Sequence, residues 1–360
     1  MFIINRIVFA LNGLAILALL LSYVAPFVSP ELYWPVAFLG LAYPVLVLLN
    51  CVLMVYWIAV FKLRFLYSLI IILLGYNFIP SYVQFGAKAT SENENSLSIV
   101  SFNSKYFGAY ESKKIEQPDR FFEILDKINP DVLCFQEFQN YHTPIEKNMF
   151  KRLFKRMKGF YAYNIGLDNE GTLNGKGMVI FSRYPIIDSG VVEHQEETSN
   201  FTLFADIVAH GDTVRIINTH LQSIKFDPPQ YDAVKNISLT NDSAVSQYTT
   251  ITKKLKRAFV KRAKQAEAVR DFIEASPHKI ILTGDFNDSP TSYAFRTVKG
   301  KMKDAFVEAG SGFSRTYVGA MPSFRIDYML HDASFQSSNY YAKVFEFSDH
   351  KLLSCTIKLK

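Results

Sequence analysis

The sequence predicts an α/β (α+β) protein of layered sheets flanked by helices, preceded by three transmembrane helices. The chain is almost uncharged up to about residue 85, and it has the composition of an ordinary globular protein after residue 88. In that second part many short strand-like runs occur with only a few helix-like segments, which favours layered sheets over a simple doubly wound sheet. The second part is long enough for one large domain with a full core.

The N-terminal region, residues 1–87, contains three apolar stretches that we expect to be transmembrane helices at about residues 7–28, 34–61 and 65–85. None of the three carries a charged residue, and each reaches the roughly 20 apolar residues that a bilayer-spanning helix needs. Buried core helices are one alternative. A cleavable signal peptide is another for the first stretch, but it would leave the next two unexplained.

The few charges of this region predict its orientation. Arg6 precedes the first stretch, and Lys62 and Arg64 lie between the second and the third. Because basic residues near membrane helices stay in the cytoplasm, three spans would place the rest of the chain on the outer side. We therefore expect an integral protein of the plasma or inner membrane, with a polar linker at residues 88–96 and an extracytoplasmic catalytic domain at residues 97–360.

Local patterns predict the elements of this domain. Alternation at residues 97–102 predicts a strand, and the apolar face of residues 119–128 predicts a helix that ends before Pro130. A hairpin turn is expected at Gly211-Asp212. Further strands are expected at residues 131–135, 178–181, 203–208, 214–217, 280–282, 326–330 and 352–357.

A polar loop at about residues 223–246 interrupts this pattern, and a helix is expected at about residues 248–274. The first half of this helix is strongly basic. Such a run is usually a solvated helix face, but it also fits a patch for anionic lipid headgroups or for a phosphate backbone. Both interpretations stay open here. The basic residues are Lys253, Lys254, Lys256, Arg257, Lys261, Arg262 and Lys264.

Polar side chains able to do chemistry collect at or near the ends of the expected strands. Each alone has an ordinary explanation as a turn residue, a cap or a buried imidazole, but their joint occurrence favours a site. Carboxylate, amide and imidazole groups together can hold a hard divalent cation and move a proton. No Cys/His pair has the spacing of zinc ligands. The residues are Asn103, Glu137, Asn218, His220, Asp285, Asn287, Asp327, Asp349 and His350.

Three of these residues, Asn103, Glu137 and Asp349, supply the oxygen ligands that a magnesium site requires. Mg²⁺ takes a few carboxylate or carbonyl oxygens in proteins and keeps several waters. The predicted cofactor is therefore Mg²⁺, and Mn²⁺ is a substitute that suits similar oxygen ligands.

The other residues fit proton transfer and charge neutralisation. A general base needs an imidazole oriented by a carboxylate, which His350 and Asp327 can provide. A second imidazole, His220, together with the amides of Asn218 and Asn287, can bind a phosphate group and neutralise charge on a phosphoryl oxygen. The combination predicts a metal-assisted hydrolase.

Seven short motifs follow one another along the domain. They are Ser101-Phe102-Asn103, Asp131-Val132-Leu133 running into Gln136-Glu137, Gly177 to Ile186, Asn218-Thr219-His220, Gly284-Asp285-Phe286-Asn287, Arg325-Ile326-Asp327-Tyr328 and Ser348-Asp349-His350. In this order they resemble the endonuclease/exonuclease/phosphatase superfamily, in its deoxyribonuclease- and neutral sphingomyelinase-like branch. The resemblance covers about residues 97–360. It implies a four-layer α/β sandwich with two central mixed β-sheets and a site at their shared edge.

The resemblance also implies roles for the metal ligands and the water. Mg²⁺ would be bound by Glu137, with Asn103 nearby and Asp349 contributing. Asp285 and His350 would prepare the attacking water. Which of the two takes the proton of the water stays open.

For the remaining residues, the resemblance implies that Asp327 fixes the tautomer of His350. Asn287 and His220 would bind the phosphate and stabilise the pentavalent transition state, with His220 protonating the leaving oxygen. Spacing alone does not identify the carboxylate that should orient His220.

These observations predict a membrane-anchored, Mg²⁺-dependent phosphoester hydrolase, a phosphodiesterase or endonuclease-like enzyme. One alternative is a lipid headgroup phosphodiesterase of the sphingomyelinase or phosphoinositide phosphatase kind. Another is an inactive binding module tethered to the membrane. The expected partners are a nucleic acid or phospholipid phosphoester and the membrane itself, and no protein partner follows from the sequence.

Overall fold

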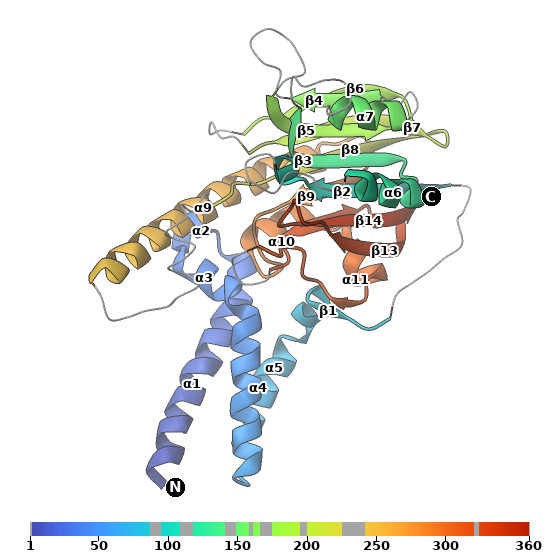
Figure 1. Ribbon diagram of the computed structural model, residues 1–360. Helices are drawn as coiled ribbons and strands as arrows, with labels where there is room; N and C mark the ends of the chain where they lie inside the picture. The colour runs from blue at the N-terminus through green and yellow to red at the C-terminus, as the bar shows by residue number, and fades with distance from the viewer. Residues whose placement is uncertain are drawn as a thin grey trace.

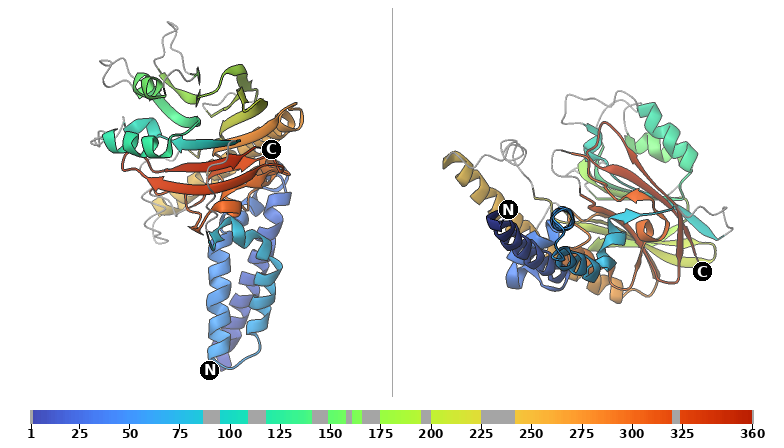
Figure 2. Two further views of the ribbon diagram at one scale, coloured as in Figure 1. Left: turned by 90° about the vertical axis from the view of Figure 1, so that its right-hand side faces the viewer. Right: turned by 90° about the horizontal axis from the view of Figure 1, so that it is seen from below.

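The computed structural model has a stalk of apolar N-terminal helices beneath a domain of two stacked β-sheets (Figure 1). Two further views show the stalk helices running side by side (Figure 2). Most of the predicted linker and most of the predicted loop after residue 223 lie outside the described residues. The structure describes residues 2–86, 95–108, 118–140, 149–157, 161–165, 175–194, 200–224, 242–319 and 324–359.

The stalk consists of α1, α4 and α5, and the shorter helices lie at its upper end beside the domain (Figure 1). Many large apolar side chains of the stalk are exposed along its length. The helices are α1 (Phe2–Val24), η1 (Ala25–Phe27), α2 (Pro30–Tyr33), α3 (Pro35–Leu41), α4 (Tyr43–Ala59), α5 (Phe65–Leu74) and η2 (Tyr76–Ser81).

Buried polar side chains join the three stalk helices. Asn12 Nδ2 of α1 donates to Ser68 Oγ of α5 at 2.7 Å, and Ser68 Oγ donates to Asn50 Oδ1 of α4 at 3.2 Å. Trp57 Nε1 donates to Asn12 Oδ1 at 2.9 Å. Polar groups bonded between helices, with apolar side chains outside, are typical of helices that pack in lipid.

The prediction of three bilayer-spanning helices is wrong in helix length. Among the described residues, one helix, Phe2–Phe27, is long and apolar enough to cross a membrane, and α3 and α4 qualify only as a pair bent by 65°. The stretch at 34–61 breaks where α4 begins because Pro44 lacks the N–H that would continue the helix. In the stretch at 65–85, α5 is 10 residues long and ends before Gly75.

The described strands of the domain form two six-stranded sheets, in the orders β13-β14-β2-β3-β5-β4 and β10-β12-β9-β8-β7-β6. β2 and β3 are parallel, as are β8 and β9, and the neighbouring pairs such as β14 with β2 and β12 with β9 are antiparallel. The prediction of two mixed sheets is confirmed. The first sheet contains β2 (Ser96–Asn103), β3 (Val132–Asn140), β4 (Tyr161–Ile165), β5 (Gly175–Ser182), β13 (Gln336–Val344) and β14 (Lys351–Lys358). The second contains β6 (Ile186–Val192), β7 (Thr202–Ala209), β8 (Asp212–His220), β9 (Lys279–Asp285), β10 (Lys303–Asp304) and β12 (Asp327–His331).

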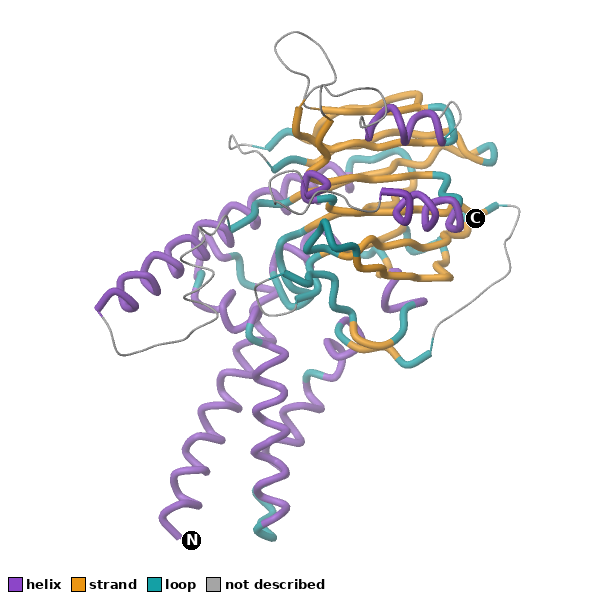
Figure 3. The backbone as a smooth tube through the Cα atoms, viewed as in Figure 1, coloured by secondary structure: helices purple, strands orange, loops and turns teal. Residues whose placement is uncertain are grey.

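The apolar cores divide the domain into four layers, helix, sheet, sheet and helix; Figure 3 distinguishes its helices from its strands by colour. Between the sheets, Ile99 and Leu353 of the first pack in one core with Ile216 and Met329 of the second. α6 and α7 cover the outer face of the first sheet, and α9 and α10 cover that of the second. The helices are α6 (Pro118–Ile128), α7 (Met149–Arg156), α9 (Asp242–Glu274), α10 (Tyr293–Lys299) and α11 (Ala305–Ala309), with the 3-10 turn η3 at Lys105–Gly108.

The hairpin turn between β7 and β8 lies one residue earlier than predicted. Ala209 pairs with Asp212, so the two turn residues are His210 and Gly211, whose φ angles are +53° and +86°. Positive φ at both central residues defines the type I′ turn, whose twist matches that of the strands it joins.

The upper end of the stalk is bonded to the domain. Thr291 Oγ1 donates to Gly40 O at 2.7 Å and is 2.7 Å from the hydroxyl of Tyr82. A Cβ at Gly40 would lie 2.6 Å from Thr291 O, so the close approach requires glycine. β1 (Val83–Gln84) also pairs with β11 (Gly312–Phe313). The N-terminal region is thus part of one packed structure with the sheets.

Candidate active site

The two parallel strand pairs bring the predicted residues together. The parallel pairing of β2 with β3 ends at Asn103 and Gln136, next to Glu137 within β3, and β8 and β9 end at His220 and Asp285, which are register partners. Because the carboxyl ends of parallel strands share an edge, the side chains of each sheet collect there. Asn103 Nδ2 donates to Asp285 Oδ2 at 3.0 Å across the two sheets, so both sheets contribute to one cluster.

Asp285 is the centre of this cluster and is 1% exposed. Its Oδ2 lies 3.7 Å from the Nε2 atoms of both His220 and His350. Burial and, to a smaller extent, the nearby charge of Asp327 raise the pKa of Asp285 to about 6, against the lowering effect of His350. A carboxylate that titrates near neutrality is suited to accept a proton.

His350 is held by Asp327, as the sequence predicts. Its Nδ1 lies 3.0 Å from both carboxylate oxygens of Asp327, which stands opposite Asp285 in the β12–β9 pairing. Burial lowers the pKa of His350, but the carboxylates of Asp327 and Asp285 outweigh it and raise the pKa to about 10. His350 is therefore an imidazolium at neutral pH. Environments that separate two pKa values in this way are typical of acid and base partners.

Glu137 lies beside this cluster on an irregular part of β3. The pairing of β3 with β5 shifts between Phe135 and Phe138, and Glu137 has a φ of +46°. A bulge of this kind re-aims a side chain. Glu137 Oε1 is 3.8 Å from His220 Nε2, and burial raises the pKa of Glu137.

Asp349 and Lys105 complete this side of the site. Asp349 Oδ2 lies 3.2 Å from Lys105 Nζ, and its Oδ1 lies 3.9 Å from His350 Nε2. The nearby charge of Asp349 contributes to the raised pKa of Glu137. Crowded carboxylates with an amide oxygen nearby are a donor set that fits Mg²⁺, so the residues present suit that ion.

A second set of ligand atoms, one each from Asp285, Asp327 and His350, lies within 4.8 Å of one another. The hydrogen bond from His350 to Asp327 already uses two of these groups. A cation bound there would have to break that bond and remove the proton of an imidazole whose pKa is raised. The oxygen-rich side with Glu137 and Asp349 is therefore the better place for a hard ion.

Asn218 lies inside the sandwich, away from the open side of the cluster. Its Nδ2 donates to the carbonyl oxygens of Phe135 and Val179 at 3.0 and 3.3 Å. Its Oδ1 accepts from Gln136 Nε2 at 2.6 Å, and the side chain is fully buried. These bonds tie the two sheets together and leave no donor of Asn218 directed at a substrate.

Asn287 follows Asp285 in a tight turn with a φ of +53°. Its backbone N–H donates to Asp285 Oδ1 at 2.8 Å, and its Nδ2 donates to Leu221 O at 3.0 Å. The turn orients the carboxylate of Asp285 through a backbone bond. Asn287 is partly exposed beside the cluster.

Arg262 and Asp288 form a buried pair that supports this turn, and the pair was not predicted from the sequence. Arg262 was counted in the basic run of α9, but it is 1% exposed. Its Nε lies 3.1 Å from Asp288 Oδ2, and its Nη1 donates to Asn287 O at 2.5 Å. One signal was available in the sequence. Ala258 and Ala266 lie four residues from Arg262 and Phe259 lies three residues from it, so Arg262 shares the apolar face of the helix.

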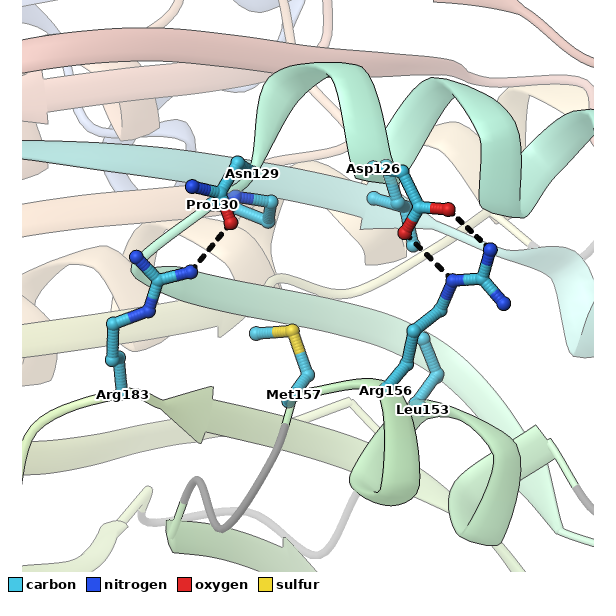
Figure 4. Close-up of a pocket in the computed structure, with 8 residues that line it drawn as sticks. Asp126, Asn129, Pro130, Leu153, Arg156, Met157 and Arg183 are labelled. Atoms are coloured by element: carbon cyan, nitrogen blue, oxygen red, sulfur yellow. Dashed lines mark hydrogen bonds and ion pairs between the residues drawn. The ribbon is translucent and has the colours of Figure 1, made fainter.

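A cavity of about 490 Å³ lies elsewhere, lined by residues of α6 and α7 and by Asn129 and Pro130, which precede β3 (Figure 4). Its arginines already have partners: Arg156 pairs with Asp126, and Arg183 donates to Asn129 at 2.6 Å. The cavity holds no carboxylate–imidazole cluster among its described lining residues. The strand-end cluster is therefore the candidate active site among the described residues.

Solved structures share this fold at low sequence identity. Human Nocturnin, solved as a catalytic domain with bound sulfate, matches with a TM-score of 0.53 and 15% identity, covering 75% of this chain and 96% of that one. Zebrafish (D. rerio) TDP2 complexed with a single-strand DNA product matches with a TM-score of 0.51 and 17% identity, covering 73% and 99%. A humanized D. rerio TDP2 matches with a TM-score of 0.51 and 18% identity, covering 73% and 99%.

Sequence models cover both parts of the chain, while a search of curated proteins found no match. Residues 5–82 match a domain of unknown function (DUF8431). Residues 100–350, most of the chain, match the endonuclease/exonuclease/phosphatase family. Taken with the two mixed sheets and the cluster at their shared edge, this match shows that the chain belongs to the endonuclease/exonuclease/phosphatase family.

Proposed function

We propose that this protein is a membrane-anchored, Mg²⁺-dependent phosphodiester hydrolase. Members of its family hydrolyse phosphoester bonds. The observation that carries the proposal is the buried Asp285 between two imidazoles, with Oδ2 3.7 Å from His220 Nε2 and 3.7 Å from His350 Nε2. A carboxylate placed between two imidazoles can accept a proton while the imidazoles face the developing negative charge of a phosphoryl group.

The side chains have different roles because their protonation states at neutral pH differ. Asp285, whose pKa is about 6, is ionised at neutral pH and accepts the proton of the attacking water. His350, whose pKa is about 10, is charged and stabilises the negative oxygens in the transition state. His220, whose Nε2 lies 3.8 Å from Glu137 Oε1, is the group that we propose to protonate the leaving oxygen.

Glu137, Asp349 and the amide oxygen of Asn103 would hold Mg²⁺. The ion supplies charge neutralisation and orients the phosphoryl group when it is bound. Lys105, 3.2 Å from Asp349, adds a positive charge at the same side. Asn287, partly exposed beside Asp285, is the amide we propose for binding phosphate, whereas Asn218 has a positioning role.

The stalk supports anchoring in a membrane. α1 has 23 residues, about 34 Å of helix, against a hydrocarbon thickness of roughly 30 Å. The N-terminus marks the end of the stalk away from the domain (Figure 1). Arg6 lies near the start of α1, and Lys62 and Arg64 lie between α4 and α5, with Arg64 over the ring of Phe9 in α1. By the positive-inside rule this end faces the cytoplasm and the domain lies outside. Alkaline phosphatase and green fluorescent protein fused after Lys360 test this: activity of the first alone supports the orientation, and fluorescence of the second alone contradicts it.

Two classes of phosphodiester remain as substrates. The similar TDP2 structure contains a single-strand DNA product, which supports a nucleic acid. The bonds from Thr291 to Gly40 and Tyr82 hold the site close to the anchoring helices, and this favours a phospholipid headgroup as the second candidate.

Assays of the detergent-purified full chain separate these candidates. We expect Mg²⁺-dependent turnover of DNA, RNA, sphingomyelin or a phosphoinositide, and loss of that turnover with a chelator. Asp285→Asn and His350→Gln should abolish it, while Lys155→Gln on the distant helix α7 serves as a matched surface control. A chain that is folded and inactive on all four substrates would instead support a binding module.

A further inference from the structure

A stripe of cations on α9 faces the upper end of the stalk. Lys253, Lys256 and Arg257 are exposed, and residues three and four apart share one face of an α-helix. Lys264 lies about two turns beyond Arg257 on the same face, and its Nζ is 3.3 Å from Glu31 Oε1 of α2. These four cations, the α9 cationic stripe, therefore follow the side of α9 that meets α2.

The residues around α2 have the composition of a membrane interface. Phe27, Leu32 and Tyr33 are 59%, 83% and 57% exposed. Lys256 Nζ lies 5.3 Å from the centroid of the Trp34 ring. Exposed apolar and aromatic side chains beside lysines are typical of the headgroup level, where rings and long charged side chains bridge lipid and water.

The length of α1 sets the level of α2 in a bilayer. The 23 residues of α1 are just long enough to cross the hydrocarbon, and α2 follows after the short helix η1. If α1 crosses the membrane, α2 lies just outside the hydrocarbon. The α9 cationic stripe, in contact with α2, then lies among the headgroups, and the N-terminal half of α9 projects beyond the sheets at this level (Figure 1).

We propose that the α9 cationic stripe binds anionic phospholipid headgroups of the leaflet on the catalytic side. This proposal rests on the membrane anchoring proposed above. Each basic side chain close to an anionic surface raises binding roughly fivefold. The same helix carries Arg262, which donates to Asn287 O, so the lipid-facing stripe and the catalytic turn share one helix.

Quenching of Trp34 by brominated lipids tests the proposal. The full chain is placed in phosphatidylcholine vesicles that contain equal fractions of brominated phosphatidylglycerol or brominated phosphatidylcholine. The chain has two tryptophans, and Trp57 is fully buried, so the Trp34→Phe variant supplies the background. We expect at least about twofold stronger quenching by the anionic lipid, and loss of the difference at about 1 M salt, where the Debye length is about 3 Å.

The triple variant Lys253→Gln/Lys256→Gln/Arg257→Gln should quench equally with both lipids. The matched control Arg120→Gln/Lys127→Gln/Lys155→Gln removes three exposed cations of α6 and α7, away from the stalk (Figure 1), and should behave as the unmodified chain.

Each other outcome has a separate meaning. Equal quenching of the unmodified chain by the two lipids overturns the proposal and leaves the anchoring intact. If the triple variant also binds less DNA than the unmodified chain, the stripe is instead a contact surface for a nucleic-acid phosphate backbone. No quenching by either lipid places Trp34 away from the bilayer and contradicts the anchoring itself.

Discussion

Replacing Arg262 with methionine is expected to destabilise the domain and to displace the turn that carries Asn287. The guanidinium is 1% exposed and pairs with Asp288, which is 4% exposed, at 3.1 Å. Its Nη1 also donates to the carbonyl oxygens of Asn287 and Gln222, at 2.5 and 3.3 Å. Methionine fills a similar volume but leaves the carboxylate of Asp288 and these two carbonyl oxygens without their donor.

The expected cost follows from that uncompensated charge. Removing one partner of a buried ion pair costs about 3–5 kcal/mol, and one kcal/mol shifts the melting temperature of a domain of this size by roughly 2–4 °C. We therefore expect the midpoint of thermal unfolding to fall by about 6–20 °C. kcat should fall with it because Asn287 donates its backbone N–H to Asp285 Oδ1.

Circular dichroism melts of the detergent-solubilised full chain measure this effect. The control is Arg270→Met on the same helix, where the arginine is 38% exposed and pairs with the adjacent Asp271. Exposed pairs contribute about 0–1 kcal/mol, so this control should melt close to the unmodified chain. Asp288→Asn combined with Arg262→Met should recover part of the loss because it removes the unpaired charge.

The pH dependence of the Arg262→Met deficit has a defined sign. Burial raises the pKa of Asp288, and Arg262 opposes that rise; without Arg262 the folded-state pKa rises further above the unfolded value. Stability is then lost as pH rises through the folded-state pKa, so the deficit should be largest at alkaline pH and shrink toward acid. If the free energy of unfolding of the Arg262→Met variant stays within about 1 kcal/mol of that of the unmodified chain at every pH, the reasoning is refuted.

Three further predictions concern the site and its supports. Asp285→Asn should lower kcat by about 10²–10⁴-fold with the melting temperature retained. The kcat/KM of the unmodified protein should rise with pH through about 6 as Asp285 ionises and fall near 10 as His350 loses its proton. A flat pH profile would contradict these roles. Thr291→Val removes the donor to Gly40 O and should cost about 1–3 kcal/mol in thermal melts, whereas Thr291→Ser, which keeps the hydroxyl, should not. Asn218→Ala should also lower the melting temperature, because Phe135 O and Val179 O lose their donor; unchanged stability with a raised KM would instead support a phosphate-binding role.

Local patterns in the sequence predicted the strands of both sheets that carry the site. Asp285 and His220 were expected at strand ends, and the parallel register of β8 and β9 brings them side by side. The strand β13 and the helices α10 and α11 were not expected, because their packing depends on neighbours far away in the chain. Pro44 was visible, but membrane helices tolerate interior proline, so the pattern alone did not predict the break.

For the site as well, the chemical groups were predicted from the sequence, whereas some contacts with segments distant in the chain were not. The pairing of His350 with Asp327 was predicted from residue chemistry, and the 3.0 Å contact agrees with it. Asn218 was expected at the phosphate, yet its bonds to Phe135 and Val179 place it between the sheets. A tripeptide motif records which side chains are present and not which partners the other sheet offers.

The sequence by itself determined the apolar stalk, the mixed α/β domain and the chemical groups at its strand ends, because periodicity and residue type are local properties. Only the tertiary structure decided that Arg262 is buried under Asn287, that Asn218 joins the sheets, and that Thr291 bonds the stalk to the domain. The physical reason is that burial and hydrogen-bond partners come from segments distant in the chain, and they decide whether a polar group is solvated, structural or reactive.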